Sequence, residues 1–581
     1  MLLAVGMAYA RNPSSRTPAN TAAPPQHHQQ DLRVPRDGKP LQVDNRVAAG
    51  VLVLLVLAAY LPGFGAGFIW DDDAHVTSSR PVVESSGLSS IWLKPGSVPQ
   101  YYPLTHTSFW IEYRLWGSDP LGYHAVNILL HAVSAVVLWR VLVGLGVPGS
   151  WLAAALFAVH PVHAESVVWI SERKNTLSGL FALASTWAWL GWWRSGARLF
   201  RGRWWLALLL FAGALLSKTV TVTLPAAWLV MCWWRVGGIG RREWSSVLPM
   251  LVLALPMGLM TIWTEQHHIA GGHLDLGLSA VDRLLVAGRA LWFYAGKLFW
   301  PSELTFIYFR WSIDSTSFTA WVYPLGVVAL VALLWHQRSR VGRGPLAAVL
   351  LFAGTLVPAL GFVDVYPMQF SFVADHFQYL ASIPLLTAAA WLIVTRWYAT
   401  HGGVLVLVLV VVSFFHSRVF SDSLTLWSDT VSKNPTSALA LTSLGNELAA
   451  VGSHELAERR YREAIRVDPE FPDAWVNLSV ELQSRGQRDE ALRAAIWAVE
   501  LAPWLPRARV NLALGLGERG RYDEAVQQLE AAVVGDEEFV EAWVHLARFE
   551  LIRKNQSGLE RAIEGLRRLD PRLARELDPS P

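Results

Sequence analysis

Cysteine is almost absent from this sequence: Cys232 is the one example, and it lies in an apolar stretch. A single thiol excludes an intrachain disulfide and a metal site built from several cysteines. Charged side chains are also scarce, at 16% of 581 residues, where soluble globular proteins carry about 25%. Lys and Arg number 49 and Asp and Glu 46, without any basic run, so we expect no nucleic-acid partner.

Hydrophobic residues make up 53% of the chain and lie mainly before about Phe420, whereas charged residues crowd the last third. This division predicts an integral membrane domain over 46–420 and a water-exposed region after it. Residues 1–45 are rich in Pro, Ser, Gln and Ala and lack apolar periodicity, which predicts a disordered cytoplasmic N-terminus. The first ten residues have no basic flank, so we expect no cleaved signal peptide.

Eleven apolar stretches are candidates for membrane spans, since a helix needs roughly 20 mainly apolar residues to cross the hydrocarbon. They are Val47–Phe68, Ala125–Leu145, Trp151–Ile170, Thr176–Trp193, Trp204–Leu216, Val220–Trp234, Val247–Trp263, Trp321–Trp335, Pro345–Phe362, Phe377–Val394 and Gly403–Phe415. The sequence therefore predicts an all-α, polytopic helix bundle.

The distribution of Lys and Arg predicts the orientation, because positive residues stay on the cytoplasmic side. Arg33, Arg36, Lys39 and Arg46 precede the first span and place the N-terminus inside. The remaining basic loops alternate consistently only if Asp282–Phe299 lies at the outer interface as an amphipathic helix. An odd number of spans then places the C-terminal region outside; if Asp282–Phe299 crosses, that conclusion reverses.

A 34-residue period follows the spans, and this is the length of a tetratricopeptide repeat (TPR). After a linker at 421–436, we predict that 437–581 forms an α-solenoid of paired helices with a concave groove. The groove would bind a peptide; a spacer or a dimerisation arm is the alternative. The leucines that mark the register are Leu444, Leu478, Leu512 and Leu546.

Three adjacent acids, Asp71, Asp72 and Asp73, follow the first span and open a long outer loop at 71–123. Adjacent carboxylates repel one another, and their ionised forms are costly beside hydrocarbon. One of them can act as a general base toward a hydroxyl acceptor while a neighbour orients it or binds a cation. The alternative is a solvated acidic start to the loop.

Further ionisable side chains interrupt or end apolar spans, where charged groups are costly. In the predicted topology they all lie on the outer side of the membrane, as a single active site on that side requires. Arg173 or Lys174 would neutralise a lipid-linked phosphate; the alternative is that they snorkel at a span end. The predicted substrate-binding residues are Asp73, His163, Glu165, Arg173, Lys174, Lys218, Asp375 and His376.

With these residues the chain resembles the transmembrane and tetratricopeptide repeat-containing O-mannosyltransferases, and more closely their bacterial relatives. The resemblance rests on WDDDAHV, YYPLTHTSFW, GYHAVNILLH, LFAVHPVHAESVVWISERKNTLSGLF, LSKTVTVTLP, ADHFQYLASIP and the repeats in their order. It implies a C-type glycosyltransferase (GT-C) fold, a polyprenyl-phosphate-linked sugar donor and an acidic catalytic motif. Carried across, the base is Asp71, with Asp72 beside it, although the third acid leaves this alignment ambiguous by one position.

The resulting hypothesis is a glycosyltransferase that moves a sugar, with mannose inferred only from kin, from a polyprenyl-phosphate carrier to a hydroxyl of a protein or envelope acceptor. We expect it in the bacterial inner membrane with the repeats on the periplasmic side. No cofactor or metal is needed, although paired carboxylates would accept a divalent cation. Two alternatives remain: a non-enzymatic membrane-anchored repeat scaffold for an envelope complex, and a transporter of a lipid-linked sugar, for which we find no internal symmetry.

Overall fold

The computed structural model describes residues 44–266, 275–396 and 399–578, so the predicted disordered segment 1–45 lies almost wholly outside the described residues. Every regular element in these three ranges is helical, which confirms the all-α prediction. The helices before the repeats are α1 (Asn45–Ala59), α2 (Asp72–His75), α3 (Arg80–Val83), α4 (Leu88–Leu93), α5 (Pro103–Trp116), α6 (Pro120–Gly144), α7 (Ser150–Val159), α8 (Ala164–Val168), α9 (Arg173–Ser195), α10 (Arg203–Ser217), α11 (Leu224–Val236), α12 (Arg241–Thr264), α13 (Ala280–Phe299), α14 (Phe318–Val341), α15 (Gly344–Leu356), α16 (Ser382–Arg396) and α17 (Ala399–Ser417).

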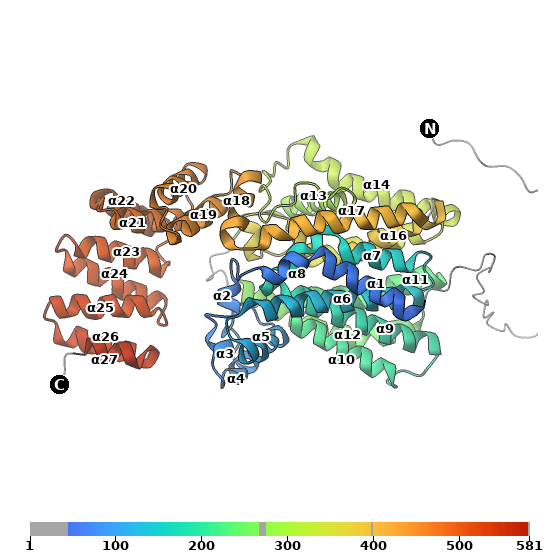
Figure 1. Cartoon of the computed structure of the whole chain (residues 1–581), viewed down its shortest axis with the longest axis horizontal. Coiled ribbons are helices and arrows are strands. Elements are labelled where there is room, and N and C mark those ends of the chain that lie inside the picture. Colours follow the sequence, from blue (N-terminus) through green and yellow to red (C-terminus); the bar gives the residue numbers. More distant parts are fainter. Residues whose placement is uncertain (1–43, 267–274, 397–398, 579–581) are drawn as a thin grey trace, which may run out of the picture. The chain divides into compact units, whose positions relative to one another are not determined.

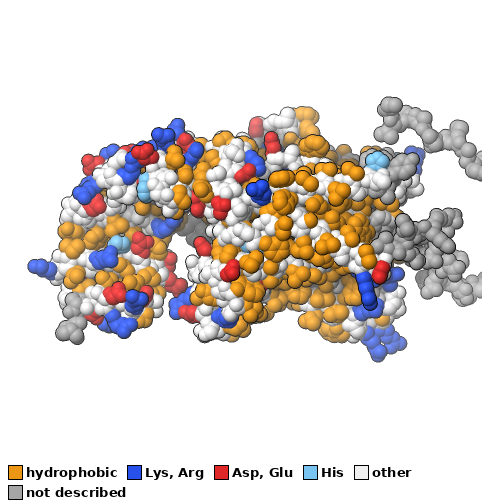
Figure 2. Space-filling model, in the orientation of Figure 1, with side chains coloured by type: hydrophobic (Ala, Val, Ile, Leu, Met, Phe, Trp, Pro, Cys, Tyr) orange, Lys and Arg blue, Asp and Glu red, His pale blue; other side chains and the backbone are white. Residues whose placement is uncertain are grey.

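Four helices in the described ranges are long and apolar enough to cross a membrane, or five if one bent pair counts as a span. They are α6, α12, α14 and Thr400–Phe420, with the pair Ser150–Val159 and Pro161–Val168 bent by 54°. Each of the eleven predicted stretches contains helix, but several helices fall short of full span length, so the count of eleven stays a prediction. Hydrophobic side chains cover the visible face of this helical region, as expected for a membrane protein (Figure 2).

The bent pair has a local cause. Pro161 lacks a backbone N–H and disfavours helical geometry at the residue before it, so α7 ends and His160 is extended, with ψ of 128°. A short 3-10 turn, η2 (Pro161–His163), then leads into α8. This break carries the polar HPVHAE segment into the interior, where its residues are buried.

Helix α13 covers the segment predicted to lie at the interface. It is amphipathic and is not among the helices apolar enough to span. Arg283 near its start donates to Asp364, with Nη1 and Oδ1 2.8 Å apart. The interfacial position of α13 stays a prediction that rests on the distribution of Lys and Arg.

The repeats consist of antiparallel helix pairs (Figure 1). Their helices are α18 (Ser423–Lys433) in the linker and α19 (Ala438–Ala450), α20 (His454–Val467), α21 (Pro472–Ser484), α22 (Arg488–Leu501), α23 (Pro506–Gly517), α24 (Tyr522–Gly535), α25 (Val540–Ile552), α26 (Gln556–Leu569) and α27 (Pro571–Leu577). Gly445 lets α20 approach α19, because a Cβ there would lie 2.5 Å from the Tyr461 ring. The predicted TPR architecture is confirmed.

Candidate active site

The outer loop at 71–123, called the acidic loop from here on, begins at an unusual backbone turn. Trp70 adopts a φ of 52°, in the left-handed region that is unfavourable for a bulky residue. Its ring packs edge-on against Trp427, with centroids 4.9 Å apart, and this packing holds the turn. Because the chain reverses here, Asp71 and Asp72 follow directly beside the short 3-10 turn η3 (Ile170–Glu172).

Asp72 is fully buried and acts as a clamp between two chain segments. Its Oδ2 accepts from the Ile69 N–H at 2.9 Å, and its Oδ1 accepts from the Ser171 N–H at 2.7 Å. Burial, and then the charge of Asp71, raise the pKa of Asp72 well above its usual range. Both carboxyl oxygens of Asp72 are thus occupied by backbone donors, and the predicted catalytic role of Asp72 stays a prediction.

Asp71 is the more accessible of the pair, with a side chain 31% exposed. Its Oδ1 accepts from the Ser171 hydroxyl at 2.7 Å, and its Oδ2 lies 3.3 Å from His75 Nε2. Burial by itself would raise the pKa of Asp71, but the charge and hydrogen bond of His75, together with Lys174, outweigh it and lower the pKa below 3.8. Asp71 is therefore an ionised carboxylate at neutral pH.

Two stacked histidines stand behind Asp71. His106 Nδ1 faces the Tyr102 carbonyl at 3.1 Å, and this contact requires a proton on Nδ1. Burial, and then His75, lower the pKa of His106 to about 3, so the ring is neutral and its Nε2 accepts from His75 Nδ1 at 3.2 Å. His75 Nε2 in turn lies 3.3 Å from Asp71 Oδ2, and this contact fixes the orientation of the carboxylate.

Asp73, predicted to bind substrate, is exposed and points to its own loop. Its Oδ1 accepts from the Thr77 hydroxyl at 2.7 Å. The structure therefore does not bring Asp73 together with Asp71 and Asp72.

Two lysines share one buried carboxylate beside the acidic loop. Lys174 Nζ lies 3.0 Å from Glu172 Oε1, and Lys218 Nζ lies 3.2 Å from Glu172 Oε2. Asn175 donates to the same Oε2 at 2.5 Å. Lys174 and Lys218 thus bring two cations to one carboxylate, and Asp71 and Glu165 also lie near enough to interact electrostatically with them.

The pKa shifts in this cluster follow its charges. Burial would raise the pKa of Glu172, but His376, Lys174 and Lys218 lower it further than burial raises it. For Lys174, burial lowers the pKa, but Glu172 and Asp71 raise it more. For Lys218, burial lowers the pKa, and Glu172 only partly offsets this while Lys174 adds to it, so the net shift is downward. Glu172 belongs to the same group of ionisable residues at the end of an apolar span as Arg173 and Lys174, but it was not among the predicted substrate-binding residues.

A second acid–histidine group adjoins the lysines. His376 Nδ1 lies 2.8 Å from Glu165 Oε1, and its Nε2 lies 4.0 Å from Glu172 Oε1. Next to it, Asp375 accepts from the Tyr308 hydroxyl at 3.0 Å. Burial, and then the charge of Glu165, raise the pKa of Asp375 to about 8. The structure thus brings Glu165, Lys174, Lys218, Asp375 and His376 together, and their role in substrate binding stays a prediction.

His163 lies apart from this group. It is fully buried, with Nδ1 2.9 Å from the Phe157 carbonyl and Nε2 3.0 Å from the Ser382 hydroxyl. Both ring nitrogens are therefore used within the protein, and His163 connects α7 to α16.

Arg173 is also fully buried, and acceptors from the protein surround its guanidinium. It forms a bidentate ion pair with Glu112 and donates to Asn127, to the Tyr123 carbonyl and to the Ser108 hydroxyl. With its donors occupied, Arg173 joins α9 to α5 and α6 and has no free face for a phosphate.

Replacing Arg173 by Met is expected to destabilise the protein by roughly 3–5 kcal/mol, because Glu112 would remain as an unpaired buried charge. The measurement is thermal unfolding of the full chain in detergent. The double variant Arg173→Met with Glu112→Leu is the control and should recover much of the loss. Unchanged stability together with weaker donor binding would instead identify Arg173 as a phosphate ligand.

Within the described residues, no group of three or more His, Cys, Asp or Glu side chains is arranged to hold a metal ion. The expectation that no metal is needed stays a prediction.

The fold and site together define a polytopic membrane protein with C-terminal TPR repeats. Its sequence is similar to TMTC-type protein O-mannosyl-transferases, which confirms the predicted resemblance to that family, while the closer resemblance to bacterial relatives stays a prediction. Protein O-mannosyl-transferase F38B6.6 of Caenorhabditis elegans is 24% identical over 475 residues, which cover 72% of this chain and 63% of that protein. Tmtc1 of Drosophila melanogaster is 28% identical (57% and 40% covered), and TMTC3 of Mus musculus is 33% identical (23% and 16% covered).

The chain thus spans less than two thirds of the length of these relatives. No protein-family model matches it. Among solved structures, YrrB, described as a TPR protein with an unusual peptide-binding site, is 22% identical and covers 26% of this chain and 80% of its own, with a TM-score of 0.23. MamA is 15% identical and covers 26% of this chain and 89% of its own, with a TM-score of 0.24.

Proposed function

We propose that this chain is a membrane glycosyltransferase that moves a sugar from a polyprenyl-phosphate carrier to a hydroxyl of a protein or envelope acceptor. The observation that carries the proposal is the placement of an ionised, partly exposed Asp71 beside two lysines that share one carboxylate. The chain segment from Ser171 to Lys174 joins the two groups, since Ser171 donates to Asp71 and Lys174 lies three residues further on. A base and a phosphate site are the two parts that such a transfer needs.

In the proposed step, Asp71 accepts the proton of the acceptor hydroxyl. The hydroxyl oxygen forms a bond to the anomeric carbon of the sugar, and the bond from that carbon to the phosphate oxygen breaks. The electron pair of the broken bond leaves with the carrier phosphate. Lys174 and Lys218 stabilise the charge that develops there, because fixed cations act most strongly where water is excluded.

Asp72 and the two histidines act on Asp71 indirectly. Asp72 ties the acidic loop to η3, and His75, supported by His106, holds Oδ2 of Asp71. The second oxygen is held by Ser171, so the carboxylate meets the acceptor in one orientation.

The remaining parts of the proposal concern topology and acceptor. The domain over 46–420 would be a GT-C-like bundle of about eleven spans in the bacterial inner membrane. After the linker at 421–436, the repeats at 437–581 would lie on the periplasmic side, where their groove binds the acceptor or a partner protein. Mannose is the proposed sugar, by similarity to the relatives named above.

The test incubates the purified full chain with radiolabelled polyprenyl-phosphate sugars, mannose among them, and proteins of the outer compartment. Label is expected on protein with at least one donor, and it should be lost in the double variant Asp71→Asn with Asp72→Asn. Equal labelling by the wild type and the double variant would remove the catalytic assignment. Absence of label with every donor and acceptor would favour the scaffold.

A further inference from the structure

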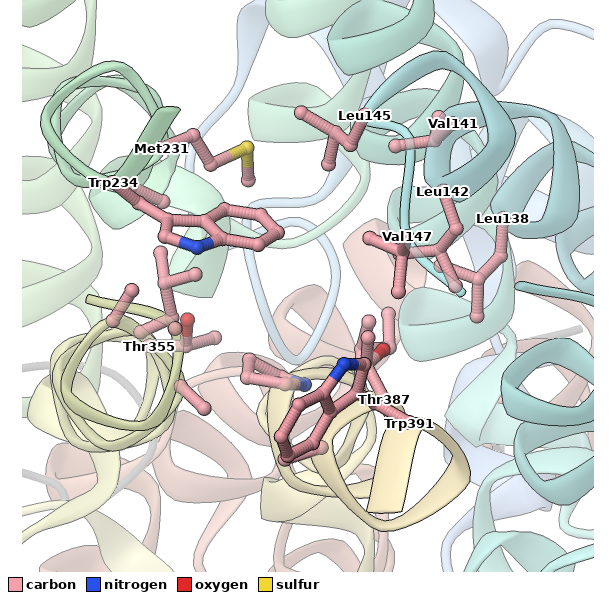
Figure 3. Close-up of a pocket in the computed structure, with 18 of the residues that line it drawn as sticks. Leu138, Val141, Leu142, Leu145, Val147, Met231, Trp234, Thr355, Thr387 and Trp391 are labelled. Atoms are coloured by element: carbon pink, nitrogen blue, oxygen red, sulfur yellow. The ribbon is translucent and has the colours of Figure 1, made fainter. Parts of the chain in front are cut away.

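A large apolar cavity lies between α6, α9, α11, α15 and α16 (Figure 3). Its volume is about 620 Å³, within the range of about 300–1,000 Å³ that is usual for ligand pockets. Leu138, Val141, Leu145, Met231 and Trp391 are among the side chains that face it. Such a lining suits a hydrocarbon chain.

One end of the cavity is positively charged. Arg235, in the last turn of α11, and Arg343, just before α15, both line it. Among the described residues, neither guanidinium has a hydrogen bond or an ion pair. Arg235 has only a long contact to the Trp234 ring, at 5.5 Å from the ring centroid. Both arginines therefore keep their donors for a ligand.

Two glycines allow the arginines to approach this end. A Cβ at Gly237 would lie 2.4 Å from both terminal nitrogens of Arg343, and a Cβ at Gly146 would lie 3.4 Å from Arg235 Nη2. Both glycines have positive φ, at 83° and 66°, so they also close α11 and the turn after α6. The backbone N–H groups at the start of α15 add to the positive potential at the same end.

We propose that this cavity binds an anionic phospholipid, with an acyl chain in the apolar slot and the headgroup phosphate on Arg235 and Arg343. In the predicted topology both arginines lie on the cytoplasmic side, where anionic lipids are found and basic pockets between helices bind them. This site is independent of the proposed transferase function.

The position of the arginines separates the proposed headgroup site from the two lysines, while the apolar cavity itself extends to Val220 and Thr221 near Lys218. Lys218 precedes the N-terminal end of α11, whereas Arg235 lies near its C-terminal end. Arg235 lies eleven residues after Leu224, which corresponds to about 16 Å of helix at 1.5 Å per residue. One phosphate cannot reach both groups, so a lipid held by the arginines is not the donor bound at Lys174 and Lys218.

The experiment is native mass spectrometry of the purified full chain after exchange with phosphatidylglycerol, with phosphatidylcholine of the same acyl chains, or with polyprenyl phosphate. Phosphatidylglycerol is expected to be retained preferentially, and each of Arg235→Gln and Arg343→Gln should weaken retention about fivefold. Arg340→Gln, which changes a basic residue of α14 that does not line the cavity, is the matched control. Ala227→Phe should lose the lipid by filling the slot with the charges intact.

Equal retention of the two phospholipids by the wild type would overturn the proposal, as would retention of polyprenyl phosphate that Arg235→Gln and Arg343→Gln weaken more than they weaken retention of phosphatidylglycerol. The wild-type comparison needs no substitution, so it decides the matter even if an arginine variant fails to fold. If the wild type retains phosphatidylglycerol preferentially but transfers no sugar, that result would count against the proposed function alone.

Discussion

Asp71→Asn is expected to lower kcat for sugar transfer by about 10²–10⁴-fold, the usual contribution of a general base. Asn has nearly the shape of Asp but cannot accept the proton of the acceptor hydroxyl. The hydrogen bond from Ser171 to Oδ1 can be kept by the amide oxygen, so the fold and the donor KM should change little. Initial rates of label transfer from a polyprenyl-phosphate sugar measure the effect.

The neighbouring acids provide matched controls. Asp73→Asn should retain activity, because Asp73 is exposed and its carboxylate accepts from Thr77 of the same loop. Asp72→Asn should lose stability as well as activity: an amide has one acceptor oxygen for two backbone donors, and an orphaned buried N–H costs about 1–3 kcal/mol. Full activity in Asp71→Asn, with loss in Asp73→Asn, would shift the catalytic role to the third acid.

The second large effect on kcat is expected when either lysine of the proposed phosphate site is replaced. Lys174→Gln or Lys218→Gln should lower kcat by about 10²–10³-fold, the usual cost of losing one donor that stabilises a developing negative charge. Each substitution also leaves Glu172 with one cation fewer. Lys94→Gln, which changes an exposed lysine in the outer loop at 71–123, is the control and should leave kcat unchanged. Normal kcat in both cluster variants would place the phosphate elsewhere.

The pH dependence of kcat/KM should follow the protonation of Lys218, whose pKa is lowered. Burial lowers the pKa of Lys218 below its usual range, so this ammonium loses its proton at a lower pH than an exposed lysine does. The alkaline limb of kcat/KM should therefore fall below pH 10.5. Arginine keeps its charge to higher pH, so Lys218→Arg should move the limb upward. A limb that stays in place would exclude Lys218 as its cause.

The features that repeat or run locally along the chain were predictable from the sequence. The 34-residue leucine register indicated the solenoid, and apolar runs indicated helices in every predicted stretch. The acids, Lys174, Lys218 and the Asp375–His376 pair were identified because ionisable groups are costly at membrane depth. We predicted that these residues form one group because a single active site must face one side of the membrane.

The roles of individual residues needed contacts between distant segments. The sequence predicted that Arg173 binds a phosphate, but in the structure its guanidinium forms an ion pair with Glu112, 61 positions earlier. Asp71 and Asp72 are equivalent by composition, and only the placement of the Ser171 backbone N–H makes one a clamp and the other accessible. Such pairings depend on tertiary packing, which periodicity and motif spacing do not encode.

The proposed transfer requires the acidic loop and the repeats to face the same outer compartment. Single cysteines at Asp73 and Val534, both exposed, would be treated with a membrane-impermeant maleimide in intact cells, with the buried Cys232 as the low background. We expect both introduced thiols to react from outside, and neither to need permeabilisation. Labelling of the Asp73 position from outside while the Val534 position reacts only after permeabilisation would contradict the account, because base and acceptor groove would then lie on opposite sides of the bilayer.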